Sequence, residues 1–291
     1  LDLLADAYAK VGKFKQAEEC FKKIIQINPN YPGVYTNLGN LYESLINLYQ
    51  GSGDLDKAIE VYEKFIDLRP QDFSIYLRLS DVYLQQGDYD KAIEIYQKLV
   101  QITPSSLETY RRLSEAYRLK GEDLKRVECL EQGLRAIPDS LTLLDLLADA
   151  YAKVGKFKQA EECFKKIIQI NPNYPGVYTN LGNLYMNTGN DGKAIEYYEQ
   201  ALEVDPSISE LYSKLGYMYS HKGNYNKAIY NFEKFLHYQP KHPEIHYVLG
   251  QAYLNVDNRN KVLNEIDILR KWGYNDFADP LEDMLKEHYS E

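Results

Sequence analysis

Two histidines are the residues whose spacing comes closest to that of a metal site. His242 and His246 are four residues apart, and this spacing can place two ligands on one helix face. Pro243, however, starts a helix and leaves His242 outside it, at the cap. No nearby cysteine completes a ligand set. We therefore expect no metal and no cofactor.

Catalytic motifs are absent from the sequence. There is no Gly-rich phosphate loop, no HExxH and no CxxC. Adjacent carboxylates such as Glu18–Glu19 and Glu161–Glu162 are expected on solvated helix faces, because nothing indicates an apolar pocket that would raise a pKa. We expect no catalytic residue and no enzymatic activity.

Composition and charge exclude further classes of function. The 291 residues carry a formal net charge of −9, whereas nucleic acids and anionic membranes call for a basic surface. No apolar run approaches the ~18 residues of a membrane span, so membrane insertion is not expected. Three cysteines give no disulfide framework and favour a reducing, cytoplasmic compartment. The start at Leu1, without Met, leaves a removed leader open.

A period of 34 residues runs through most of the chain. Two residue types follow it independently: Pro70, Pro104, Pro138, Pro172, Pro206 and Pro240, and Tyr49, Tyr83, Tyr117, Tyr151, Tyr185, Tyr219 and Tyr253. Residues 175–208 show one repeat. Helical spacing predicts a first helix, Gly189 breaks it, and Pro206 ends a second helix. The small residues Gly182 and Ala194 allow the two helices to approach closely.

This pattern resembles the tetratricopeptide repeat family, in which an aromatic residue, Leu-Gly, Tyr, Ala, a second aromatic, Ala and Pro recur in 34 residues. The resemblance covers residues 1 to about 275 and implies an all-α, right-handed superhelical solenoid whose first helices line a concave face. We assign eight repeats: 1–31, 32–72, 73–106, 107–140, 141–174, 175–208, 209–242 and 243–275. Residues 276–291 are expected to form a C-terminal capping helix.

One repeat departs from the pattern near its centre. Arg126 replaces the small alanine of the second helix, and Gly133 replaces the later alanine. We expect Gly133 to make room for the Arg126 side chain. Cys20, Cys129 and Cys163 share one repeat position in the second helix, which indicates packed thiols.

Residues 1–42 are identical to residues 144–185 at all 42 positions. The array covers residues 43–275. Its first seven residues, 43–49, are additional to the 34-residue period and connect the array to the copy. Seven residues are close to two helical turns, so the apolar face is nearly preserved. We predict one continuous helix from Val34 to Tyr49 in which Tyr42 serves both patterns; the alternative is a loop at Glu43–Ser44. The copy is either recent in evolution or an engineered fusion.

The resemblance also implies that a partner binds in the groove lined by the first helices. Carried over to this chain, the groove positions are Arg78, Asp81, Arg111, Arg112, Arg118, Asp145, Asp149, Asn180, Asn183, Lys214, Tyr217 and Tyr247. The carboxylate clamp that some family members use on chaperone tails is absent as a set, because Asp145 and Asp149 replace its Lys and Asn. An arginine cluster beside an acidic patch, with amides that can bond a peptide backbone, remains.

The sequence therefore predicts a non-catalytic scaffold that binds a protein or peptide partner. One alternative is the accessory arm of a larger enzyme, similar to the asparagine-lined arm of the O-linked N-acetylglucosamine transferase. Only Asn37 and Asn180 match that row, and they are copies of each other. Another alternative is self-association through the N-terminal repeat, whose first helix has an apolar face.

Overall fold

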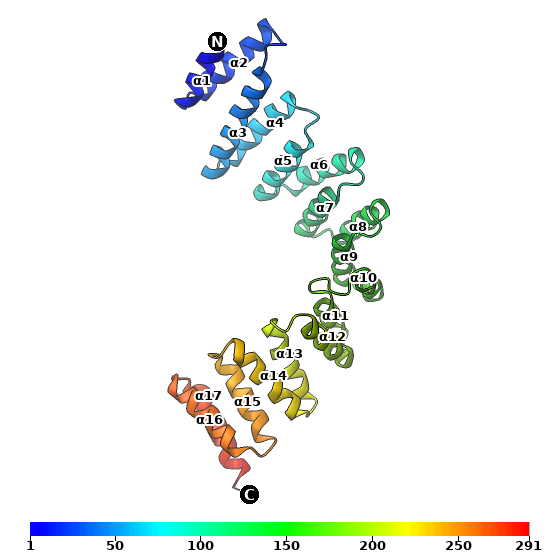
Figure 1. Ribbon diagram of the computed structural model, residues 1–291, viewed down its shortest axis with the longest axis vertical. Coiled ribbons are helices and arrows are strands. Elements are labelled where there is room, and N and C mark those ends of the chain that lie inside the picture. Colours follow the sequence, from blue (N-terminus) through cyan, green and yellow to red (C-terminus); the bar gives the residue numbers. More distant parts are fainter. Residues whose placement is uncertain (291) are drawn as a thin grey trace. The chain divides into compact units, whose positions relative to one another are not determined.

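The computed structural model describes residues 1–290, and within them it contains seventeen α-helices and no strand (Figure 1). Their bounds are α1 Asp2–Lys10, α2 Phe14–Ile27, α3 Val34–Ser52, α4 Leu55–Leu68, α5 Phe73–Gln86, α6 Tyr89–Ile102, α7 Leu107–Lys120, α8 Asp123–Ala136, α9 Leu141–Lys153, α10 Phe157–Ile170, α11 Val177–Asn187, α12 Asp191–Val204, α13 Ser209–His221, α14 Tyr225–Tyr238, α15 Pro243–Leu254, α16 Arg259–Lys271 and α17 Asn275–His288. The chain is thus an all-α repeat solenoid, as the 34-residue period predicts.

The helices pack as consecutive pairs in two compact units. Unit 1 comprises Leu1–Ala160, and unit 2 begins at Glu161, so the boundary falls within α10. In each unit, helices contact their neighbours along the chain. Such an array has no single core, and each repeat is stabilised by the repeats next to it.

The small-residue seam between paired helices is confirmed in unit 2. Gly182 of α11 faces Tyr198 of α12 so closely that an added Cβ would lie 2.4 Å from the tyrosine ring. Ala194 is fully buried in the same interface, and so is Tyr198. A side chain larger than hydrogen at Gly182 would push the two helices apart.

The long helix α3 is continuous. It runs from Val34 to Ser52, so the seven additional residues lie inside one helix and form no loop at Glu43–Ser44. It ends at Gly53, whose φ of 76° is the left-handed conformation that closes a helix C-terminus. Leu45 and Ile46, within the added segment, are buried.

Tyr42 of α3 contacts the helices on both sides of it, as the overlap of the two patterns predicts. Its hydroxyl donates to Glu18 Oε1 of α2 at 3.1 Å. Its ring meets Phe65 of α4 edge-on, with centroids 5.9 Å apart. Tyr35, seven residues before Tyr42 on the same helix, is 42% exposed. The side chain of Glu18, expected on a solvated face, is only 13% exposed.

The two identical segments differ in burial because their surroundings differ. Leu144 and Leu147 of α9 are 3% and 4% exposed, whereas the equivalent Leu1 and Leu4 are 53% and 46% exposed. In unit 1, α9 packs against α7 and α8. The same amino acids therefore form a buried helix face in one copy and a partly exposed face in the other.

Gly133 does not accommodate Arg126, and the sequence-based expectation is wrong on this point. A Cβ added to Gly133 would lie 3.0 Å from Tyr110 and 3.1 Å from Leu143. The glycine therefore makes room for an aromatic ring of α7 and for the start of α9. Arg126 is directed elsewhere, toward α9, where it finds a carboxylate.

The C-terminal helix α17 packs on α15 and α16, with Leu281 and Leu285 buried against them. Met284, three residues after Leu281 on the same helix, is 37% exposed. Its sulfur lies 3.8 Å from the Tyr247 hydroxyl and 3.6 Å from the Gln251 amide. Residue 291 of the expected capping segment lies outside the described residues.

Candidate functional site

The groove positions predicted from the sequence lie on α5, α7 and α9 in unit 1 and on α11, α13 and α15 in unit 2. We call their surface the first-helix face of each unit. In unit 1, Asp81 of α5 accepts a hydrogen bond from the buried Tyr96 hydroxyl of α6 at 3.0 Å. Arg112 of α7 forms an ion pair with the same carboxylate. Three successive helices thus hold one polar cluster.

The same cluster recurs in unit 2. Asn183 of α11 accepts hydrogen bonds from the Tyr198 hydroxyl at 2.7 Å and from Lys214 Nζ of α13 at 2.9 Å. Each member is 102 residues after its counterpart in unit 1, which equals three repeats. Lys214 also lies over the Tyr198 ring, 5.3 Å from its centroid. We call these two clusters the Asp81 triad and the Asn183 triad.

The tyrosine fixes each triad in place. Burial raises the pKa of Tyr198 to about 12 and also raises that of Tyr96, so both hydroxyls remain protonated donors at neutral pH. Because each hydroxyl donates to the acidic or amide side chain, that side chain is held in one orientation. Asn47, Tyr62 and Arg78 occupy the same positions one repeat before the Asp81 triad.

The arginine cluster of α7 is largely neutralised by its own helix. Arg111 donates to both oxygens of Glu108 at 2.9 and 2.8 Å, and Arg112 shares the same carboxylate at 2.5 Å. Hydrogen bonding to Arg111, and then to Arg112, lowers the pKa of Glu108 to about 2 against the opposing effect of burial. Arg118 is paired with Glu115 at 2.6 Å.

The acidic patch of α9 is compensated as well. Asp149 Oδ2 accepts a hydrogen bond from Arg126 Nη1 of α8 at 2.8 Å. The Arg126 side chain is 4% exposed, whereas that of Asp149 is 68% exposed, so a buried cation is neutralised at the surface. Asp145 lies half-buried on the same helix, and Asn180 lies half-buried on α11 in unit 2.

Two tyrosines predicted for the groove lie half-buried in unit 2. Tyr217 of α13 meets Phe232 of α14 edge-on, with centroids 5.3 Å apart. Tyr247 of α15 contacts Phe277 of α17 at 5.8 Å. Each ring is therefore held by an aromatic neighbour.

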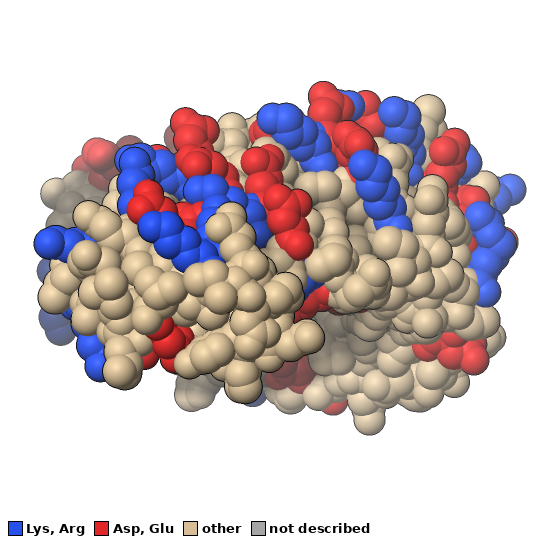
Figure 2. Space-filling view, turned by 90° about the horizontal axis from the view of Figure 1, so that it is seen from above, with Lys and Arg blue, Asp and Glu red and all other residues tan. Residues whose placement is uncertain are grey.

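Charges of opposite sign alternate on this protein. On the face that Figure 2 shows, Lys and Arg side chains lie beside Asp and Glu side chains and form no extended area of one sign. The net field over this face is therefore small.

The histidines singled out in the sequence have structural partners. His242 is the N-cap of α15, as expected, and contacts the Phe235 ring. His246 is buried and has an acceptor at each ring nitrogen: Glu265 Oε2 is 2.5 Å from Nδ1, and the Pro240 carbonyl is 2.9 Å from Nε2. Within residues 1–290, no group of three or more His, Cys, Asp or Glu side chains could hold a metal ion.

The described helices include none that is both long and apolar enough to cross a membrane. The three thiols are buried, and burial raises the pKa of Cys129 to about 12, which makes it a neutral packing group.

Sequence reasoning missed the residues that organise this face. Tyr96 and Tyr198 were not assigned to the groove, although their recurrence 102 residues apart, each fifteen residues after an Asp or Asn, is visible in the sequence. Glu108 was missed as well. Its positions three and four residues before Arg111 and Arg112 are those that interact on a helix surface.

Comparisons with known proteins identify one kind of repeat in this chain. Family models described as tetratricopeptide or TPR repeats match residues 43–106; 3–31 and 175–208; 148–189 and 216–257; and 20–60 and 197–230. Together these segments span most of the chain. No curated protein matches the sequence.

Several solved structures are similar. MamA is 28% identical over 56% of this chain and 95% of its own, with a TM-score of 0.50. The C-terminal part of a TPR repeat-containing protein from Cytophaga hutchinsonii is 19% identical over 84% and 98%, with a TM-score of 0.62. YrrB, a TPR protein with an unusual peptide-binding site, is 21% identical over 66% and 98%, with a TM-score of 0.50. The last two likenesses concern the fold alone.

Proposed function

Because the chain belongs to the tetratricopeptide repeat family, whose members generally serve as protein-interaction scaffolds, we propose that it is a non-catalytic scaffold that holds a segment of a partner protein on its first-helix face. The observation that carries this proposal is the recurrence of the Asp81 triad and the Asn183 triad. Each presents a fixed polar side chain and a cation at the same repeat position. Fixed groups lose little entropy on binding.

The chemistry of the triads indicates what such a segment offers. The Asn183 oxygen already accepts from Tyr198 and Lys214, so its amide nitrogen provides the donors for a peptide carbonyl. Lys214 beside it provides a cation for a carboxylate. In unit 1, Arg78 and Arg118 are exposed on the same face, and Arg78 forms no ion pair within the described residues.

The test is affinity capture from source-cell lysate with a face variant, Arg78→Glu/Arg118→Glu. The matched control, Lys22→Glu/Lys98→Glu, makes the same change of charge on exposed second-helix positions of unit 1. A partner retained by the parent and the control but lost by the folded face variant supports the proposal. Equal retention by all three proteins refutes it.

Self-association is a second candidate, favoured by one observation. Leu1, Leu3 and Leu4 of the first helix are 53%, 85% and 46% exposed. The identical segment at 144–154 is covered by a neighbouring repeat, so this face is able to bind a helix pair. A mass that increases with concentration in sedimentation velocity, and no longer does so after Leu4→Glu, supports self-association. A constant monomeric mass removes it.

A further inference from the structure

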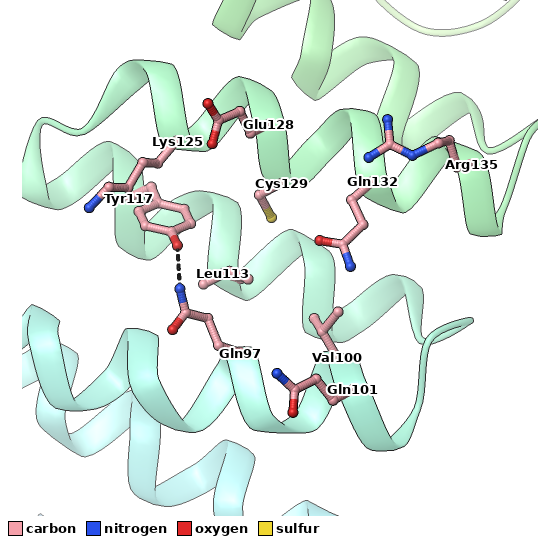
Figure 3. A pocket seen from close by; sticks show the side chains of 10 residues that line it. All are labelled: Gln97, Val100, Gln101, Leu113, Tyr117, Lys125, Glu128, Cys129, Gln132 and Arg135. Atoms are coloured by element: carbon pink, nitrogen blue, oxygen red, sulfur yellow. Dashed lines mark hydrogen bonds between the residues drawn. The ribbon is translucent and has the colours of Figure 1, made fainter.

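A cleft opens in unit 1 between the second helices α6 and α8, with α7 as its floor. Its volume is about 610 Å³, which lies within the range of ~300–1,000 Å³ typical of ligand sites. Figure 3 shows that Gln97 and Gln101 enter it from α6, while Gln132 and Arg135 enter it from α8. None of these residues belongs to the first-helix face, so this cleft is a separate surface.

Because the sequence repeats, this cleft can be compared with its counterpart in unit 2. A second cleft of about 470 Å³ lies between α12, α13 and α14 in unit 2, and its lining positions are 102 residues later. Glu199 and Glu203 stand there in place of Gln97 and Gln101. The two clefts therefore share geometry and differ in charge.

The replacement of Glu by Gln at position 97 reverses a hydrogen bond. At the equivalent positions Glu131, Glu199 and Glu233, the carboxylate accepts a hydrogen bond from a tyrosine hydroxyl at 2.5–2.7 Å. Gln97 instead donates its amide to the Tyr117 hydroxyl at 2.8 Å. The cleft of unit 1 thus loses a negative charge that recurs elsewhere in the array.

The remaining polar groups make one end of the cleft cationic. Arg135 is exposed at the last turn of α8 and forms no ion pair within the described residues. Lys125, at the other end, is paired with Glu122 at 2.9 Å, and the exposed Glu128 also lines that end, which therefore carries no net positive charge. The amides of Gln101 and Gln132 form no hydrogen bond within residues 1–290. In Figure 3 the two side chains lie on opposite sides of the cleft.

We propose that the α6–α8 cleft binds an extended, acidic segment of a partner protein. Gln101 and Gln132 bond its backbone, because each amide has both donors and acceptors. Arg135 pairs with a carboxylate side chain of the segment, a geometry that guanidinium groups favour. In the cleft of unit 2, Glu199 is paired with Lys227 at 3.5 Å, and Glu203 repels the same segment. The proposal is independent of the first-helix face.

The experiment selects heptapeptides from a phage-displayed library on the whole chain, with counter-selection on an Arg135→Glu variant. The strongest peptide is then synthesised with a fluorescein label, beside a form in which every Asp and Glu is replaced by Asn and Gln. Fluorescence anisotropy gives the Kd for each variant, after circular dichroism has shown that the variant is folded.

We expect peptides enriched in Asp and Glu whose Kd rises about tenfold or more with Arg135→Glu and with Gln97→Glu/Gln101→Glu. The matched control, Glu199→Gln/Glu203→Gln, changes the equivalent positions of unit 2 and leaves Kd unchanged. Three results overturn the proposal: no enrichment over the counter-selection, binding that survives replacement of the acidic residues, or binding that depends on Arg78 and Arg118 of the first-helix face.

Discussion

Leu4 and Leu147 are a matched pair for measuring what tertiary burial contributes, because they occupy the same position in two identical 42-residue segments. Leu147 is 4% exposed and Leu4 is 46% exposed, a difference of 42 percentage points. Full burial of a leucine side chain contributes about 1.5–3 kcal/mol, so this difference alone corresponds to roughly 1 kcal/mol. Truncation of Leu147 also leaves a cavity, and buried Leu→Ala changes cost about 2–5 kcal/mol in all.

We therefore expect Leu147→Ala to lower the free energy of unfolding by ~3 kcal/mol and Leu4→Ala to lower it by ~1 kcal/mol. Urea unfolding followed by circular dichroism measures both losses. Because repeat arrays need not unfold in one step, amide hydrogen exchange in α1 and α9 should accompany it. Equal losses at low protein concentration would refute the reasoning. A cost of Leu4→Ala that grows with concentration would instead show that a second copy covers α1 in solution.

Three further predictions use matched positions in the same way. Gly182→Ala should destabilise the protein by about 1–3 kcal/mol, since the new Cβ meets the Tyr198 ring at 2.4 Å. Gly192→Ala, whose Cβ would make only an ordinary contact with Asn190 at 3.7 Å, should cost nothing in a thermal melt. A similar cost at both sites would contradict the close approach. Asp149→Asn should lower the free energy of unfolding in urea by about 1–2 kcal/mol, because it leaves the buried Arg126 cation without a full counter-charge. Asp6→Asn, at the identical position of the other copy, removes no such pair and should be neutral. Equal effects of the two changes would contradict the role of the Arg126–Asp149 pair. The pKa of His246 is raised above 6.5: burial alone would lower it, but the hydrogen bond to Glu265 and the Pro240 carbonyl stabilise the charged ring. The stability from this pair is therefore fully present below about pH 6.5 and is lost as pH rises through the folded-state pKa. Tm should fall over that pH interval in the parent protein and in the control variant His221→Gln. A His246→Gln variant that shows the same fall in Tm would disprove the linkage.

The repeat architecture follows from the sequence because it depends on local rules. Proline and tyrosine at a 34-residue period specify where helices start, end and bury their faces, and these signals act within one or two helical turns. The continuous helix α3 was predictable for the same reason. Seven residues keep the apolar face almost in phase, and no helix breaker lies between Val34 and Tyr49.

The candidate site was predictable only in part. The predicted groove residues lie on first helices, but their partners were not predicted. The arginines of α7 are paired with Glu108 and Glu115, and the polar side chains of α5 and α11 are held by Tyr96 and Tyr198 from the following helix. The tyrosine contacts join residues fifteen positions apart. They depend on how two helices are rotated against each other, and the repeat period does not specify that rotation.

The sequence by itself determined the class of fold, the length of the repeat and the continuity of α3. Tertiary structure alone decided which side chains are buried and which are exposed. Identical segments gave a buried face at Leu147 and an exposed one at Leu4. The physical reason is that helix formation is governed by neighbours along the chain, whereas burial and pairing are governed by neighbours in space.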